Sequence, residues 1–501
     1  MNRRGILDHG GGIAALGLVA AAPAFVAYAD FILNHFYRYG AVLLDSGLLA
    51  DLAWHHGVTL RGSDVIGGQS FYAIHIAPIF VVLSALSWLV PVAMAQWFAL
   101  VTGVAHSLLA IAVFWILTAE YRMRAGWRIM AAMLLAVAFS FNGLAIAQVR
   151  YPHFEILIAD GMILFLVAWW RRRYFLAAIF FALCLICRED AGFHLFAVLA
   201  VLVALRWRDG TPLPAQKPAL IFLTAAFIYS LGAVALGIAL SPGQSSFARV
   251  YLGSPPFAHL TPLLVATRAA GFAIERAYIF LPAACAVVWA IAARNPYLLV
   301  GYIAFIPWTI LHLLARSDLA GTLSSYYGFP YLIAAFWPLI GWRMTARTVA
   351  APAWQPLLGF SVMILASFAA LSAQHDPGHV PLPGGFVDPP SFAQQARVEQ
   401  AVAAIPHDRA MLGRMLAADS IASLRPEEFR GEETFWAGPP ARRDTLFYFA
   451  GDRDAAAIAA LAAASRLTRR YAVRGTPIRI VTDRPLEGLP ALGPLLVPSA
   501  R

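Results

Sequence analysis

The chain has 501 residues, of which 60% are hydrophobic and 13% charged, and its mean hydropathy is +0.68. Several runs of 17 or more largely apolar residues exclude an ordinary soluble protein, whose core does not need segments of this length. The net charge of +10 does not indicate nucleic-acid binding. Residues 375–501 carry 15 arginines and 14 acidic residues, so nearly all the excess positive charge lies in the apolar part, where it orients a membrane protein.

Eleven apolar runs predict an α-helical polytopic membrane protein with about 11 transmembrane helices. The first follows a charged start and resembles a signal peptide, but we interpret it as an uncleaved span because many more spans follow. The runs are 11–29, 92–118, 129–149, 155–170, 174–188, 191–205, 218–240, 271–293, 297–314, 326–341 and 354–373.

The arginines predict the orientation. With the N-terminus in the cytoplasm, 14 of the 22 basic residues before position 375 (37 in the chain less 15) lie inside. Counting Ile74–Val90 as a full span would invert every later loop, so we expect a juxtamembrane or re-entrant helix there. The first external loop is then 30–91. The resulting expectation is a multi-pass membrane protein with a cytoplasmic N-terminus and an external C-terminal domain.

The composition changes after the last apolar run. We predict a transmembrane domain over 1–374, a Pro/Gly-rich linker over 375–390 and a small soluble periplasmic α/β domain over 391–501. Segments RAMLGR, DTLFYFAG and PIRIVTD alternate there with the helical pattern DAAAIAALAAASRL. The sequence shows no internal repeat and no nucleotide-binding signature.

The first external loop contains two acids that suit chemistry at a membrane surface. Asp45 follows the apolar residues AVLL, so burial would raise its proton affinity and suit it to act as a general base. The alternative is structural, since Asp45 precedes SGLLADLAW and is a plausible helix N-cap. Asp51 is six residues further on and does not share a helix face with Asp45.

Two further clusters interrupt apolar runs. In the first, Arg150, His153 and Glu155 fall within six residues, a set that suits a phosphate and an acceptor hydroxyl, although an acid is also favoured in the first turn of a helix. In the second, Arg188, Glu189 and Asp190 follow one another between two short runs, so we expect them below the surface in a protein-lined cavity.

Other residues have two interpretations each. Tyr326 and Tyr327 either line the same face or anchor the chain at the membrane interface, as tyrosine pairs commonly do. The C-x-x-C spacing of Cys184 and Cys187 is better explained by two small buried residues than by redox or metal chemistry, because no second pair or His cluster completes a site.

At these clusters the chain resembles a bacterial family of predicted membrane proteins that share a domain of unknown function. The matching elements are LLDSGLLADLAW, IHIAPIF, YPHFEIL and CREDAG, between Phe31 and Leu205, and more weakly SSYYGFPYLIA and AIPHDRAMLGRMLAADSIASLRPEEF. The architecture in turn resembles the class C glycosyltransferase (GT-C) superfamily, with an acid in the first external loop, juxtamembrane helices, many spans and an external C-terminal domain.

The resemblance implies an inverting transfer of a sugar from a polyprenyl-phosphate donor to an envelope acceptor on the periplasmic side. Asp45 would be the base and Asp51 the alternate, because DSGLLAD departs from the compact acidic pair of such enzymes. The partners expected are membrane lipid and lipid-linked sugar, without nucleic acid, and the need for a divalent metal and the oligomeric state stay open. The implied substrate-binding residues are His75, Arg150, His153, Glu155, Arg188, Glu189, Asp190, Tyr326 and Tyr327.

Two other classes of function compete with an enzyme. A transporter or flippase for a lipid-linked or anionic substrate would use Arg188, Glu189 and Asp190 as its binding site, but the chain lacks recognisable repeated halves and has a large external loop. A non-catalytic envelope scaffold would not need the acids of the membrane part.

Overall fold

The computed structural model describes most of the chain, and its residues fall into two compact units. Unit 1 comprises Met1–Ala29, Tyr72–Ile79 and Leu100–Phe386, and unit 2 comprises Asp30–Phe71, Phe80–Ala99 and Val387–Arg501. The predicted linker at 375–390 lies outside the described residues except for Pro390. The described residues are 10–54, 64–66, 68–120, 125–240, 247–323, 325–345, 352, 354–374, 390–405, 409–429, 442–450 and 455–493.

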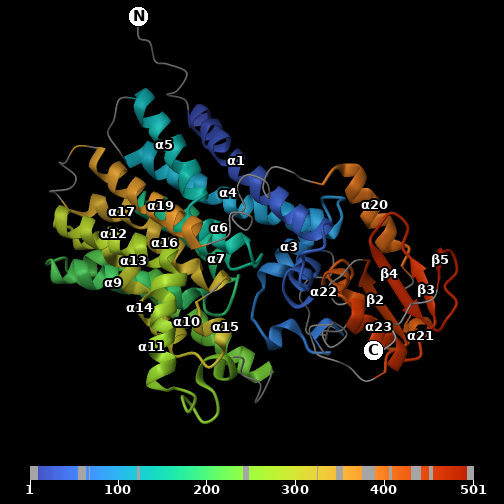
Figure 1. Cartoon of the computed structure of the whole chain (residues 1–501). Coiled ribbons are helices and arrows are strands. Elements are labelled where there is room, and N and C mark those ends of the chain that lie inside the picture. The colour runs from blue at the N-terminus through green and yellow to red at the C-terminus, as the bar shows by residue number, and fades with distance from the viewer. Residues whose placement is uncertain are drawn as a thin grey trace, which may run out of the picture. The chain divides into compact units, whose positions relative to one another are not determined.

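Apolar helices dominate the described residues, which confirms a helical membrane protein (Figure 1). They are α1 (Gly10–Tyr37), α4 (Met94–Glu120), α5 (Ala125–Ser140), α6 (Gly143–Val149), α7 (Ile156–Trp170), α8 (Tyr174–Leu185), α9 (Ala191–Arg208), α10 (Lys217–Leu240), α11 (Pro262–Glu275), α12 (Ala277–Ala293), α13 (Val300–Ala304), α14 (Ile306–Leu313), α15 (Asp318–Gly321), α16 (Phe329–Phe336), α17 (Pro338–Gly341) and α19 (Trp354–Gln374).

Six helical segments among the described residues are long and apolar enough to cross a membrane. The number rises to eight if the bent pairs α5 with α6 (44°) and α11 with α12 (78°) each form one span. All eleven predicted runs are largely helical, but α7 and α8 have only 15 and 12 residues. At 1.5 Å per residue, these two helices are shorter than a hydrocarbon core of about 30 Å.

The first external loop differs from its prediction at its start. Helix α1 continues to Tyr37, so Asp30 lies inside the helix and not in a loop. The residues after Asp30 include Phe31, Ile32 and Leu33, which favour continuation, and one acid on a helix surface does not end it. The later α3 (Ile79–Ser87) has nine residues and is too short to cross a bilayer.

The C-terminal part forms a five-stranded sheet with the order β1-β2-β4-β3-β5. The first two strands are parallel and the other pairs antiparallel. The segments DTLFYFAG and PIRIVTD supply β2 and β4 as predicted, whereas residues of RAMLGR form helix α21. The elements are β1 (Met415–Ala417), β2 (Thr445–Phe449), β3 (Arg469–Ala472), β4 (Ile478–Thr482), β5 (Ala491–Leu492), α20 (Phe392–Ala403), α21 (Arg409–Leu412), α22 (Asp419–Ala422) and α23 (Ala455–Ala464).

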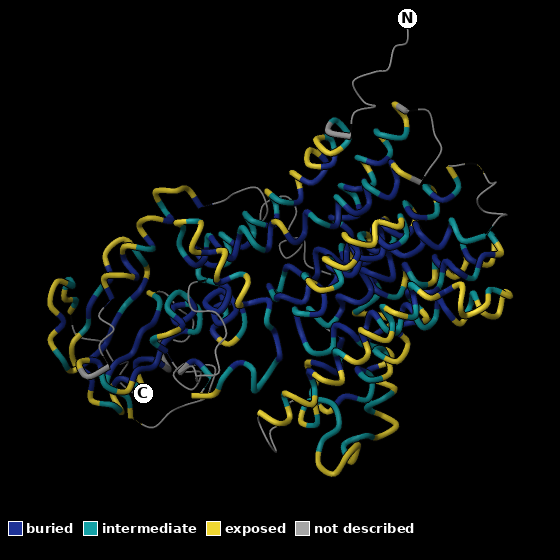
Figure 2. The backbone as a smooth tube through the Cα atoms, turned by 180° about the vertical axis from the view of Figure 1, so that it is seen from behind, coloured by how far each residue is buried: buried dark blue, intermediate teal, exposed yellow. Residues whose placement is uncertain are grey.

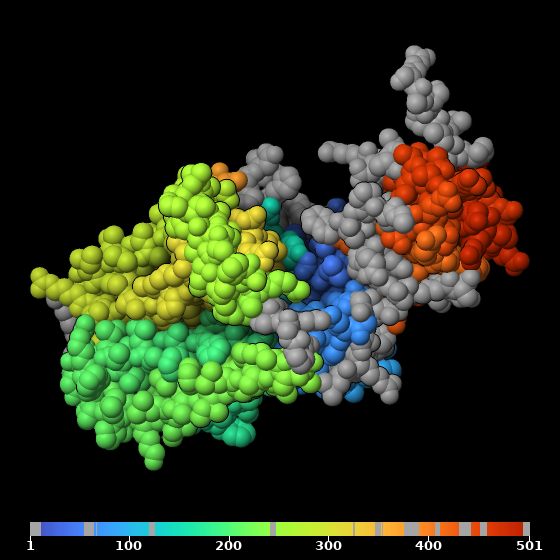
Figure 3. All heavy atoms as spheres, turned by 90° about the horizontal axis from the view of Figure 1, so that it is seen from below, coloured from blue at the N-terminus to red at the C-terminus, as the bar shows by residue number. Residues whose placement is uncertain are grey.

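Within unit 1, buried residues line the facing sides of the helices, and exposed residues occupy outer sides and loop tips (Figure 2). Helix α7 is almost entirely buried and packs along α8, while α9 packs along α10 and α13. In the view from below, the green segments around α9 and α10 lie along the yellow-green segments that follow them in the chain (Figure 3). This packing holds both ends of α7 and α9 at fixed positions within the unit.

Candidate functional site

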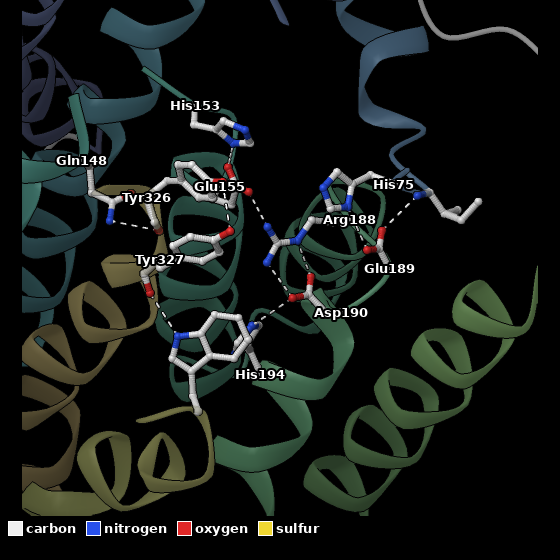
Figure 4. A network of polar contacts seen from close by, with 12 residues as sticks. His75, Gln148, His153, Glu155, Arg188, Glu189, Asp190, His194, Tyr326 and Tyr327 are labelled. Carbon is white, nitrogen blue, oxygen red and sulfur yellow. Dashed lines mark hydrogen bonds and ion pairs between the residues drawn. The ribbon is translucent and has the colours of Figure 1, made fainter. Parts of the chain in front are cut away.

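A network of charged and aromatic side chains lies in unit 1 where several apolar helices begin or end (Figure 4). The loop between α6 and α7 supplies His153 and Glu155, and the loop between α8 and α9 supplies Arg188, Glu189 and Asp190. Segments distant in sequence add His75 and the tyrosines of the 3-10 turn η8 (Ser325–Gly328). We call this set the Arg188 network.

The local sequence explains why the chain turns at these points. The Asn142 side chain accepts hydrogen bonds from the backbone N–H groups of Leu144 and Ala145 and so starts α6, and Pro152 cannot continue it. At the start of α9, a Cβ on Gly192 would lie 2.2 Å from the Ala226 carbonyl oxygen. Only glycine therefore lets α9 approach α10 this closely beside the charged loop.

Arg188 is the centre of the network and is almost completely buried, with 4% of its surface exposed. Its Nε and Nη2 donate to the two carboxylate oxygens of Asp190, both at 2.6 Å, and its Nη1 donates to Glu155. Glu155 has no exposed surface. A buried guanidinium that binds one carboxylate with two bonds and a second with one holds both acids in fixed orientations.

These contacts shift the pKa values of the pair in opposite directions. Burial opposes ionisation of Asp190, but Arg188 and His194 outweigh it and lower the pKa of this carboxyl. Burial likewise opposes the charge on Arg188, but Asp190 outweighs it and raises the pKa of the guanidinium. Asp190 therefore stays a carboxylate at neutral pH and is a poor proton acceptor.

Glu189 points to a different partner from its two neighbours. Its Oε1 accepts a hydrogen bond from His75 Nδ1 and its Oε2 one from the backbone N–H of Ile76, both at 2.9 Å. The Ile79 backbone N–H, four residues after His75, donates to the Ile186 carbonyl at 2.9 Å and joins the two segments. The side chains of His75 and Glu189 are 28% and 19% exposed, so this side of the network is not fully enclosed by protein.

The opposite side of the network is aromatic. His153 pairs with Glu155 and stacks on Tyr326, with ring centroids 4.0 Å apart. The Tyr326 hydroxyl donates to that of Tyr327 at 3.2 Å. Burial, and then the charges of Arg188 and His75, lower the pKa of His153 well below its usual value, so the ring is neutral and orients Glu155 without adding a charge.

The structure brings together eight of the eleven residues predicted for the site. They are His75, His153, Glu155, Arg188, Glu189, Asp190, Tyr326 and Tyr327, all in unit 1. The tyrosine pair belongs to the network and is not only a membrane anchor. Arg150 ends α6 half-buried, and its guanidinium makes no hydrogen bond or ion pair with the part of the chain that the structure describes.

Asp45 and Asp51 lie in unit 2. Asp45 is in the first turn of a short π-helix, η2 (Leu43–Gly47), whose N-cap is Val42, and the N-cap position of α2 (Leu48–Ala53) is Gly47. The interpretation of Asp45 as a helix N-cap is therefore wrong, because η2 begins before Asp45 and α2 is capped by Gly47. Burial, and then the nearby Asp419, raise the pKa of Asp45 to about 6. Asp51 is buried in α2.

Three residues of the network were not among those predicted for the site. Gln148 donates to the Tyr326 carbonyl at 3.3 Å, Trp308 donates to the Tyr327 carbonyl at 3.0 Å, and His194 lies 3.5 Å from Asp190. The polar Gln148 and His194 interrupt apolar helices next to predicted site residues, and this signal was available. Nothing in the sequence distinguishes Trp308 from other membrane tryptophans.

Among the described residues, no group of three or more His, Cys, Asp and Glu side chains is placed to hold a metal ion. Cys184 and Cys187 are buried free thiols, and they donate to the carbonyls of Ile158 and Leu183. The prediction that both cysteines are buried residues is confirmed.

Comparisons with protein-family models, with curated proteins and with solved structures found no match to this chain.

Proposed function

We propose that the protein is a membrane glycosyltransferase of the class C type that moves a sugar from a polyprenyl phosphate to an envelope acceptor. The observation that carries the proposal is the Arg188 network, in which charged groups lie at the ends of apolar helices and are not fully enclosed by protein at Glu189 and His75. Charged side chains among apolar helices are costly and mark substrate sites. A polyprenyl chain dissolves in lipid, so only its phosphate and sugar need such a site.

The proposed reaction is a direct displacement. The acceptor hydroxyl oxygen attacks the anomeric carbon, the bond from that carbon to the phosphate oxygen breaks, and the phosphate leaves with the lipid. A carboxylate takes the proton of the hydroxyl. One displacement inverts the configuration at the anomeric carbon.

Asp45 is the best supported base, and Asp51 is the alternate. A pKa of about 6 lets Asp45 accept a proton near neutral pH and release it afterwards, whereas Asp190 is held ionised by Arg188.

The other roles follow from which groups are already paired. Arg188 already binds Glu155 and Asp190 through three hydrogen bonds, so we assign it the positioning of these two acids. The guanidinium of Arg150 has no partner in the described residues, and we propose that it binds the leaving phosphate. The sugar hydroxyls would contact Glu189, His75 and Tyr327.

The proposal includes the orientation expected from the arginines. Eleven crossings with a cytoplasmic N-terminus would put the Arg188 network and the C-terminal sheet on the periplasmic side of a bacterial inner membrane. The short helices α7 and α8 would cross only if neighbouring helices or a locally thinner bilayer shield their ends.

The test is to express Asp45→Asn or Glu189→Gln as the sole copy in cells and to profile lipid-linked sugars and envelope glycans by mass spectrometry. We expect the donor to accumulate and one glycan to disappear in both variants. Glu275→Gln is the matched control, because Glu275 is an exposed acid of unit 1 outside the network. Unchanged glycans in both folded variants would contradict the proposed glycosyltransferase activity. An accompanying uptake defect would favour the transporter alternative.

A further inference from the structure

A second polar site lies at the other ends of α7 and α9. A cavity of about 730 Å³ is lined there by three arginines, Arg172, Arg206 and Arg343, together with Asp209 and aromatic residues such as Trp169. The Arg188 network is at the first residues of α7 and α9, whereas Trp169 and Arg206 are near their last residues. The two sites are therefore separated by the length of the helices within unit 1.

The charges of this cavity are unbalanced. Its acidic side chain, Asp209, is already engaged, because the Tyr297 hydroxyl donates to it at 2.8 Å and Arg208 lies 3.1 Å away. The guanidinium groups of Arg172 and Arg206 make no hydrogen bond or ion pair with the described residues. The guanidinium groups of Arg172 and Arg206 therefore contribute a positive potential in this cavity, which attracts an anion.

The aromatic residues suit a cavity at the level of lipid headgroups. Trp169, Trp170, Tyr174 and Tyr297 all line it, and tryptophan and tyrosine are enriched where the hydrocarbon core meets water. Arginine binds phosphate oxygens through two parallel hydrogen bonds. Three arginines therefore suit a ligand with several anionic oxygens better than they suit a single carboxylate.

We propose that this cavity binds a phosphate ester, at the end of the helix bundle opposite to the Arg188 network. Its phosphate oxygens accept hydrogen bonds from Arg172, Arg206 and Arg343, and Asp209 keeps Tyr297 in place at the wall. The phosphate comes either from an anionic lipid headgroup or from a soluble ester. The site is independent of the proposed transfer reaction.

The test uses the full-length protein in phosphatidylcholine nanodiscs and two probes, short-chain phosphatidic acid and inorganic phosphate. Binding is measured by isothermal titration calorimetry. We expect the Arg172→Gln/Arg206→Gln variant to bind the recognised probe at least about tenfold more weakly, since each charge-assisted bond contributes measurably. Binding of phosphatidic acid alone identifies a lipid headgroup, and binding of inorganic phosphate as well identifies a soluble ester.

The matched control is Arg173→Gln, which removes the same charge one residue away from Arg172 but outside the cavity lining. We expect it to bind like the unmodified protein. Arg172→Lys/Arg206→Lys keeps the charge and should retain part of the affinity. Equal weakening in Arg173→Gln and in the Arg172→Gln/Arg206→Gln variant would overturn the proposal, as would failure of the unmodified protein to bind either probe.

Discussion

Asp190 and Asp45 are both carboxylic acids among apolar residues, yet their surroundings shift their pKa values in opposite directions. Arg188 binds Asp190 with two hydrogen bonds and lowers its pKa, whereas burial and Asp419 raise the pKa of Asp45 to about 6. The first environment stabilises a fixed negative charge, and the second favours an acid that exchanges its proton near neutral pH. The proposed roles follow this difference, with orientation for Asp190 and proton transfer for Asp45.

Removal of Arg188 should have the largest effect on stability. In Arg188→Met, Glu155 and Asp190 lose their counterion, and loss of one partner of a buried pair costs about 3–5 kcal/mol. The free energy of unfolding in detergent micelles measures this loss. Arg208→Met is the control, because the exposed pair of Arg208 with Asp209 contributes at most about 1 kcal/mol. Similar losses in both variants would mean that the network does not support the fold.

The second prediction concerns pH and Asp45. Because its folded-state pKa of about 6 lies above the ordinary value of 3.8, the unfolded chain loses this proton first, and stability falls as pH rises between these two values. Asp45→Asn removes the carboxyl group that gains and loses this proton. The free energy of unfolding of the variant should equal that of the unmodified protein near pH 4 and exceed it above pH 6, by up to about 3 kcal/mol.

Denaturant titrations at several pH values check this prediction. Asp444→Asn is the control, since Asp444 is a partly exposed acid of the same unit that binds Arg414. It measures how far the exchange of an acid for its amide changes stability elsewhere in unit 2. If Asp45→Asn were less stable at every pH, the carboxylate would be stabilising and the contrast with Asp190 would fail.

A smaller effect is expected from the glycine that lets α9 approach α10. Gly192→Ala would place a Cβ 2.2 Å from the Ala226 carbonyl oxygen, and forcing an atom into packed structure costs about 1–3 kcal/mol. Gly232→Ala in α10 is the control, because a Cβ there meets no atom within 4 Å. Thermal unfolding of both variants measures the difference. A neutral Gly192→Ala would show that the helices separate without cost and that the charged loop does not depend on this contact.

The sequence was informative where local pattern decides the structure. Apolar runs predicted the helices. The triplet Arg188, Glu189 and Asp190 between two short runs predicted charges below the surface in a protein-lined cavity, and of these three side chains Arg188 is buried while Glu189 and Asp190 are partly exposed. Local pattern failed at Asp30, because one acid does not stop a helix whose following residues are apolar. It also failed at Asp45, which suits a cap by spacing but lies within a helical turn.

Long-range pairing could not be predicted. The backbone N–H of Leu43 donates a hydrogen bond to the carboxylate of Asp419, 376 positions away, and the Tyr37 hydroxyl donates one to Glu399. The first loop and the C-terminal sheet therefore belong to one unit. Likewise, nothing local pairs His75 with Glu189, 114 positions away. Such contacts depend on how elements pack and not on the residues beside each partner.

The most direct test of the proposed transfer reaction is the release of polyprenyl phosphate by the purified full-length protein. The protein is incubated with lipid-linked sugars and acceptor extracted from membranes of its own cells, and the released lipid phosphate is measured by mass spectrometry. We expect release by the unmodified protein and by Glu275→Gln. Asp45→Asn should release the lipid phosphate at a rate at least about 100-fold lower, which is the usual loss when a general base is removed. Release by Asp45→Asn at the unmodified rate would contradict the assigned base, and no release by the unmodified protein would contradict the proposed function.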